Sequence, residues 1–99
     1  MRKLFISQPM NGKTNEEILA ERDKAIVRAQ VMCEEEFEVI DSFFMDAPVE
    51  AKPLWFLGKS LELLSTADVA YFARGWQDAR GCKIEHECAA AYGIPHIAE

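Results

Sequence analysis

The feature that most constrains this chain is the alternation of short apolar runs with longer segments of helical periodicity. Apolar runs at residues 4–6, 38–41, 69–73 and 95–98 indicate strands, and the segments between them repeat apolar residues every three or four positions. Strands that alternate with helices call for a parallel sheet covered on both faces. We therefore predict one α/β domain over residues 1–99, a three-layer α/β/α structure with a parallel four-stranded sheet of Rossmann or flavodoxin-like type.

The three expected helices have recognisable signals. A capping box at Thr14–Glu17 predicts that the first helix begins there, and its apolar spacing continues to about Glu36. The residues expected on its buried face are Ile18, Ala25, Ile26, Ala29 and Cys33. The expected stripe of the second helix is Leu54, Leu57, Leu61 and Leu64. The third helix is expected from Cys82 to about Tyr92, ending at Gly93.

Composition excludes several kinds of partner. The net charge is −6, from 17 acidic and 11 basic residues, and a field of that sign repels phosphate backbones, so we expect no polymeric nucleic acid partner. The first apolar run is too short for a signal peptide, and no run approaches the roughly 20 residues of a membrane span. An odd number of cysteines, three, predicts reduced thiols and a cytoplasmic protein.

Two motifs resemble known sites without completing them. Gly12-Lys13-Thr14 resembles the end of a phosphate-binding P-loop, but that pattern needs glycine where Ser7 stands. A turn and a helix cap account for the segment, although its backbone N–H groups could still face an anion.

His86-Glu87 resembles the start of a zinc-protease helix, but Ala90 occupies the position of the required second histidine. Cys82 and Cys88 lack the paired spacing of zinc sites, so we expect them to be packing residues and predict neither a metal nor a cofactor.

A third constellation surrounds the last helix: Asp68, Asp78, Arg80, Gly81 and Glu85. Gly81 is expected where the chain turns into the helix, with Glu85 in about its first turn. If Ile84 and Cys88 face the sheet, Glu85 is rotated by about 100° and points toward Ser7 and Gln8.

The helix dipole would favour the anionic form of Glu85 by about 0.3–1 kcal/mol, so we expect an ionised carboxylate. The same dipole makes first-turn glutamates common in helices without a catalytic role. Spacing alone leaves both interpretations open.

Three segments carry a family resemblance: residues 4–9 (Leu-Phe-Ile-Ser-Gln-Pro), residues 67–72 (Ala-Asp-Val-Ala-Tyr-Phe) and residues 81–85 (Gly-Cys-Lys-Ile-Glu). Together they resemble the nucleoside 2-deoxyribosyltransferase superfamily. More narrowly, Ile-Ser-Gln-Pro-Met-Asn-Gly and Arg-Gly-Cys-Lys-Ile-Glu-His-Glu resemble a family of short phage and bacterial proteins of unassigned function within it. The narrower resemblance covers nearly the whole chain.

The resemblance implies roles for particular residues. Glu85 matches the glutamate nucleophile of those enzymes, and Asp68 matches an aspartate that helps to hold the substrate. The loop after the first strand would contact base or sugar. The residues expected to bind substrate are Ser7, Gln8, Pro9, Asn11, Gly12, Trp76, Arg80 and Gly81. One departure is His86-Glu87, where the enzymes usually carry an apolar residue and a glycine.

These residues suit cleavage or transfer at the N-glycosidic bond of a nucleoside or its 5′-monophosphate. A carboxylate can stabilise or trap the oxocarbenium-like centre that develops, and Asp78 or Asp68 could protonate the departing base. Trp76 or Tyr71 could stack on that base, while Arg74 and Arg80 could bind a phosphate or, alternatively, pair with Asp78 or Glu87.

Two other functions stay open. The His86-Glu87 departure suits a module that binds a nucleotide without turning it over. The apolar segments Trp55-Phe56 and Phe43-Phe44-Met45 exceed what so small a fold readily buries, so we also expect a homo-oligomer formed through them.

Overall fold

The computed structural model describes residues 1–43 and 47–99. Phe44 and Met45, which belong to an expected oligomer contact, lie outside the described residues. In chain order the elements are β1 (Lys3–Ser7), α1 (Asn15–Cys33), β2 (Glu38–Val39), α2 (Pro53–Leu64), β3 (Val69–Phe72), the 3-10 helix η1 (Trp76–Asp78), α3 (Arg80–Ala91) and β4 (His96–Ala98).

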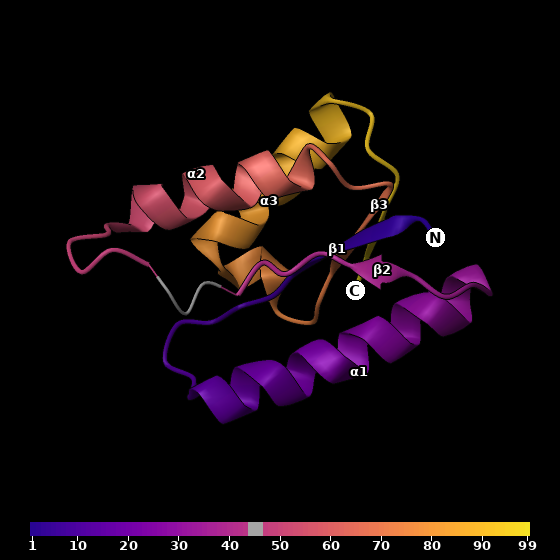
Figure 1. Ribbon diagram of the computed structural model, residues 1–99, viewed down its shortest axis with the longest axis horizontal. Helices are drawn as coiled ribbons and strands as arrows, with labels where there is room; N and C mark the ends of the chain where they lie inside the picture. Colours follow the sequence, from indigo (N-terminus) through magenta and orange to yellow (C-terminus); the bar gives the residue numbers. More distant parts are fainter. Residues whose placement is uncertain (44–46) are drawn as a thin grey trace.

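The sheet has the order β2-β1-β3-β4, with every neighbouring pair parallel. Helix α1 covers one face, and α2 and α3 cover the other (Figure 1). The predicted three-layer α/β/α fold is therefore confirmed. From β1 the chain continues to β2, which pairs with one flank of β1, and then to β3, which pairs with the other flank. The strand order therefore reverses between β1 and β3. In parallel sheets, ligand sites form beyond the carboxyl ends of the strands at such a point.

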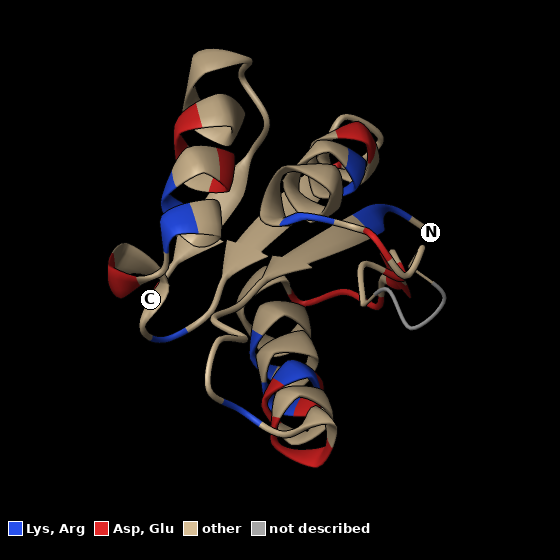
Figure 2. Cartoon of the chain, turned by 90° about the vertical axis from the view of Figure 1, so that its left-hand side faces the viewer, with Lys and Arg blue, Asp and Glu red and all other residues tan. Residues whose placement is uncertain are grey.

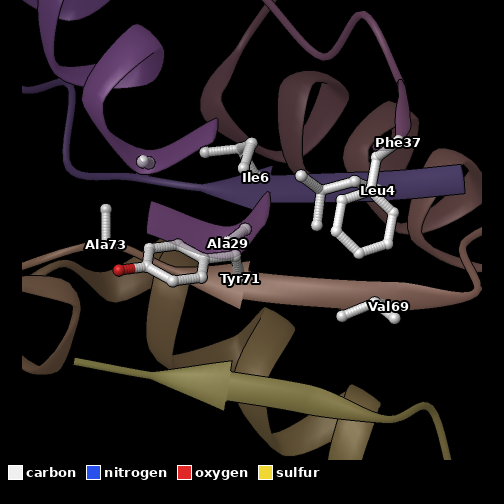
Figure 3. Close-up of a cluster of buried hydrophobic side chains, with 8 residues drawn as sticks. Leu4, Ile6, Ala29, Phe37, Val69, Tyr71 and Ala73 are labelled. Carbon is white, nitrogen blue, oxygen red and sulfur yellow. The ribbon is translucent and has the colours of Figure 1, made fainter. Parts of the chain in front are cut away.

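Alternation along β1 and β3 divides the core into two layers. Beneath α1 lie Leu4, Ile6, Val69 and Tyr71, which pack against Ala25 and Ala29 of the helix and against Phe37 (Figure 3). The opposite layer consists of Phe5, Leu64, Ala70, Phe72 and Ala89. Because odd-numbered β1 residues face α2 and α3, Ser7 also faces that side.

Helix α1 has its predicted start but ends earlier than expected. Thr14 Oγ1 accepts from the Glu17 N–H at 3.1 Å and the Glu17 carboxylate accepts from the Thr14 N–H, so the capping box is confirmed. The helix stops at Cys33 rather than near Glu36 because Glu34 is left-handed (φ 54°) and its N–H closes onto the carbonyl oxygens of Gln30 and Val31.

The expected buried face of α1 was partly wrong. Ile26 and Cys33 are only half-buried, whereas Arg22 is buried. Its guanidinium donates to Ser42 Oγ and to the Ile40 carbonyl, which satisfies a charged group that the apolar pattern did not anticipate.

The other elements depart modestly from expectation. Strand β2 spans only Glu38–Val39, and β3 and β4 are each one residue shorter than predicted. In α2, Leu64 is buried but Leu54 is 79% exposed, because the amino-terminal end of α2 extends beyond α3 (Figure 1). None of the helices in the described part of the chain has the length and apolarity to cross a bilayer.

Candidate functional site

A buried carboxylate meets the end of β1 at the point of strand reversal. The hydroxyl of Ser7 donates to Glu85 Oε1 at 2.7 Å. Ser7 is 2% exposed and Glu85 is 7% exposed. Among the described residues, no lysine, arginine or histidine forms an ion pair with Glu85. The contact with the Ser-Gln-Pro segment that the sequence predicts is therefore present.

The buried face of α3 differs from the one expected, and Glu85 belongs to it. The helix begins at Arg80, two residues before the predicted start, and its buried residues are Cys82, Glu85 and Ala89. Ile84 and Cys88, expected against the sheet, are only half-buried. The spacing of three and four residues suits both faces, and the observed packing points Glu85 directly into the molecule.

Burial raises the pKa of the Glu85 carboxyl above its ordinary value, while hydrogen bonds from the side chains of Ser7 and Ser60 act in the lowering direction. The expected lowering by the helix dipole does not prevail. Glu85 is the sixth residue of α3, so the dipole is weaker there than in the first turn, and loss of water penalises the charge more strongly. Glu85 thus combines a raised pKa with hydroxyl donors to its anion.

Two further residues lie around Glu85: Ser60, which the sequence did not predict there, and Cys82, which was expected to be a packing residue. Ser60 interrupts the leucine stripe of α2 and brings a hydroxyl to the carboxylate from that helix. A lone hydroxyl between leucines was the available signal. Burial raises the pKa of Cys82 to about 11, with the Ser7 hydroxyl acting to lower it, so Cys82 is a neutral thiol beside the same serine.

The loops after β1 and β3 approach each other closely above this cluster. Gly75 has φ +89°, and a β-carbon there would lie 3.4 Å from Cγ of Pro9. The glycine expected to make the turn into the last helix, Gly81, lies instead inside α3 and has no left-handed backbone. The turn that matters is therefore at Gly75, before η1.

Gln8, Asn11 and Gly12 do not join Glu85 in any hydrogen bond of the described residues. Gln8 faces away from Ser7, and its Nε2 donates to the carbonyl of Ile18 at 2.9 Å. Its buried Oε1 finds no partner in the described part of the chain. Asn11 and Gly12 lie in an exposed turn. Gln8 thus ties the loop to α1.

The two candidate acids lie in different places. The Asp68 carboxylate accepts from the backbone N–H of Lys3 at 2.7 Å. Lys3 is the first residue of β1 and Asp68 directly precedes β3. Asp68 therefore lies at the amino-terminal ends of the strands, whereas Ser7 lies at the carboxyl end of β1. Asp78 is exposed in η1, which packs against α3.

The ion pairs expected for two arginines were wrong. Neither Arg74 nor Arg80 forms an ion pair with Asp78 or Glu87 among the residues described. Both arginines are exposed.

The two aromatic residues expected to stack on a base are already engaged. Trp76 stacks on His86 with ring centroids 4.2 Å apart and planes 20° apart, and its Nε1 donates to the Glu99 carbonyl at 2.8 Å. One face of the indole is thus covered. Tyr71 is fully buried beneath α1, so it cannot stack on a ligand.

No family model matches this chain, and comparison with curated proteins also found no match. The resemblance to the nucleoside 2-deoxyribosyltransferase superfamily therefore remains a prediction. Within the described residues, no group of three or more histidine, cysteine, aspartate or glutamate side chains is placed to hold a metal ion.

The chemistry open to the cluster follows from its donors. A carboxylate with hydroxyl donors can act as a nucleophile or as a fixed negative charge, and exclusion of water strengthens both effects.

Proposed function

We propose that the protein cleaves or transfers the N-glycosidic bond of a nucleoside or nucleoside 5′-monophosphate, with Glu85 as nucleophile. The observation that carries this proposal is the 2.7 Å contact between Ser7 Oγ and Glu85 Oε1 at the end of β1. The absence of an ion pair to Glu85 in the described residues supports it, because a paired carboxylate would be a poorer nucleophile. The resemblance of the three sequence segments supplies the reaction class.

In the first step, a Glu85 oxygen bonds to the anomeric carbon as the glycosidic C–N bond breaks. The bonding electron pair leaves with the base nitrogen, which takes a proton from an acid. We assign that acid to Asp78 rather than Asp68, because Asp68 lies at the amino-terminal ends of the strands, whereas Asp78 follows β3 and precedes the helix that carries Glu85.

In the second step, water attacks the anomeric carbon, gives its proton to Asp78, and frees the sugar and the Glu85 carboxylate. A nitrogen of a second base in place of water makes the reaction a transfer. Glu85 attacks in its ionised form. Hydrogen bonds from Ser7 and Ser60 act to lower its pKa, against the raising effect of burial.

The test is release of free base from a panel of deoxynucleosides and their 5′-monophosphates, followed by liquid chromatography. We expect wild type to release base from at least one member and Glu85→Gln to release none. The matched control is Glu87→Gln, an exposed glutamate on the same helix, which should retain activity.

Two results would reject the proposal: equal release by wild type and Glu85→Gln, or no release across the panel. A nucleotide that stabilises the protein against heat but is recovered intact would instead indicate the non-catalytic binding module.

A further inference from the structure

A cavity of about 370 Å³ lies on the α1 face of the sheet. Its lining residues are Lys13, Glu21, Lys24, Arg28, Ala73 and Arg74. Lys24 and Arg28 belong to α1, Lys13 precedes that helix, and Arg74 follows β3. The Glu85 cluster lies on the opposite face of the sheet, toward α2 and α3. The cavity is therefore separate from that cluster, although both lie near the carboxyl ends of β1 and β3.

The charge of the cavity is opposite to that of the whole protein. Four basic side chains and one acidic one line it, although the chain has net charge −6 and only 11 basic residues. Figure 2, which views the molecule from the left of Figure 1, shows basic and acidic positions side by side on α1 and basic positions on the neighbouring loops. A local concentration of positive charge in an acidic protein favours a small anion over a polymer.

Two of the four cations are neutralised within the protein and two are not. Lys13 Nζ lies 2.7 Å from Glu21 Oε2, and Arg28 Nη1 lies 3.2 Å from Glu99 Oε2. Lys24 and Arg74 form no ion pair in the described part of the chain, and both are exposed. The cavity therefore offers one ammonium and one guanidinium group without a carboxylate partner.

A buried phenol lies on the same face of the sheet as the cavity. Tyr71 is fully buried in the layer beneath α1, where its ring points along β3 toward Ala73 (Figure 3). Burial raises the pKa of Tyr71 to about 12, and a hydrogen bond to the side chain of Glu99 acts in the same direction. Glu99 thus interacts both with Tyr71 and with Arg28.

We propose that this cavity binds a small metabolite through a phosphate or pyrophosphate group. The guanidinium of Arg74 provides the planar pair of donors that suits phosphate oxygens, and Lys24 provides a point charge. The cavity volume is at the small end of the range for ligand pockets, which suits a metabolite.

The test uses the whole protein and isothermal titration calorimetry at low ionic strength, with inorganic phosphate, pyrophosphate and ribose 5-phosphate as probes. We expect the double variant Lys24→Gln, Arg74→Gln to weaken binding at least tenfold. Lys52→Gln removes an exposed lysine at the start of α2, outside the cavity, and should leave the affinity unchanged. Arg74→Lys should bind with intermediate affinity because it keeps the charge and loses the paired donors.

Equal weakening by Lys52→Gln and by the double variant would overturn the proposal, because binding would then follow overall charge alone. Failure of all three probes to bind wild type would also overturn it. Since the substituted side chains are exposed, unchanged unfolding temperatures should confirm that the variants are folded. Glu85→Gln should bind the probes as wild type does, so that failure here is distinct from failure of the glycosidic reaction.

Discussion

Ser7→Ala isolates the contact between Ser7 and Glu85. The substitution removes one hydroxyl that donates at 2.7 Å to a carboxylate that is 7% exposed. A hydrogen bond to a charged group contributes about 1.5–3 kcal/mol, against about 0.5–1.5 kcal/mol for a neutral pair. We therefore expect Ser7→Ala to lower the free energy of unfolding by about 2 kcal/mol when Glu85 is ionised, which corresponds to roughly 10 °C in unfolding temperature.

The pH dependence distinguishes this contact from simple loss of packing. The variant should raise the pKa of Glu85 further, because one of the groups that stabilise its anion is gone. The destabilisation should shrink at acid pH, where Glu85 is protonated in both proteins. The assays are urea unfolding across pH and carbon-13 NMR titration of the Glu85 carboxyl.

Ser42→Ala is the matched control, since Ser42 is also a buried serine but contacts Arg22 rather than Glu85. It should leave the Glu85 titration unchanged. A Glu85 titration that is the same in wild type and Ser7→Ala would refute the reasoning.

Three further predictions concern stability and assembly. Because burial raises the folded-state pKa of Glu85, wild type should lose stability relative to Glu85→Gln as pH rises through that pKa, and urea unfolding curves that differ equally at all pH values would contradict this. Gly75→Ala should cost about 1–3 kcal/mol, since it forces a left-handed alanine against Pro9, whereas Gly81→Ala meets no atom within 4 Å and should be neutral or stabilising by up to about 1 kcal/mol; equal unfolding temperatures of the two variants would count against the turn at Gly75. Light scattering should find an oligomer whose mass falls in Leu54→Lys, because Leu54 is 79% exposed, and a monomeric wild type at micromolar concentration would exclude it.

The order of elements was predictable because buried parallel strands need continuous apolar runs and their covering helices need apolar stripes. Thr14 and Glu17 defined the start of α1 through chemistry local to four residues. The end of the same helix depends on the left-handed backbone of Glu34, a conformation that its side chain does not demand. Sequence reasoning therefore located the elements better than their ends.

The candidate site was predictable in outline. The predicted proximity of Glu85 and Ser7 is confirmed, although the turn expected at Gly81 and the expected sheet-facing Ile84 were wrong. The sequence did not reveal that burial raises the pKa of Glu85 more than the helix dipole lowers it, because the loss of water depends on how closely α2 and α3 pack. The same packing brings in Ser60, whose signal in the sequence is a single hydroxyl within the leucine stripe of α2. Asp68 was grouped with Glu85 in the sequence, but the structure places it at the amino-terminal ends of the strands, away from Ser7.

The most direct test of the Glu85 mechanism is mass spectrometry of the covalent intermediate. A 2-fluoro-substituted deoxynucleoside destabilises positive charge at the anomeric carbon and slows breakdown of the sugar ester. After acid quench and digestion, we predict the mass of the fluorinated sugar on the peptide that contains Glu85, and no such mass in Glu85→Gln. Base release by wild type with the sugar attached to another residue, or an unchanged adduct in Glu85→Gln, would contradict the account.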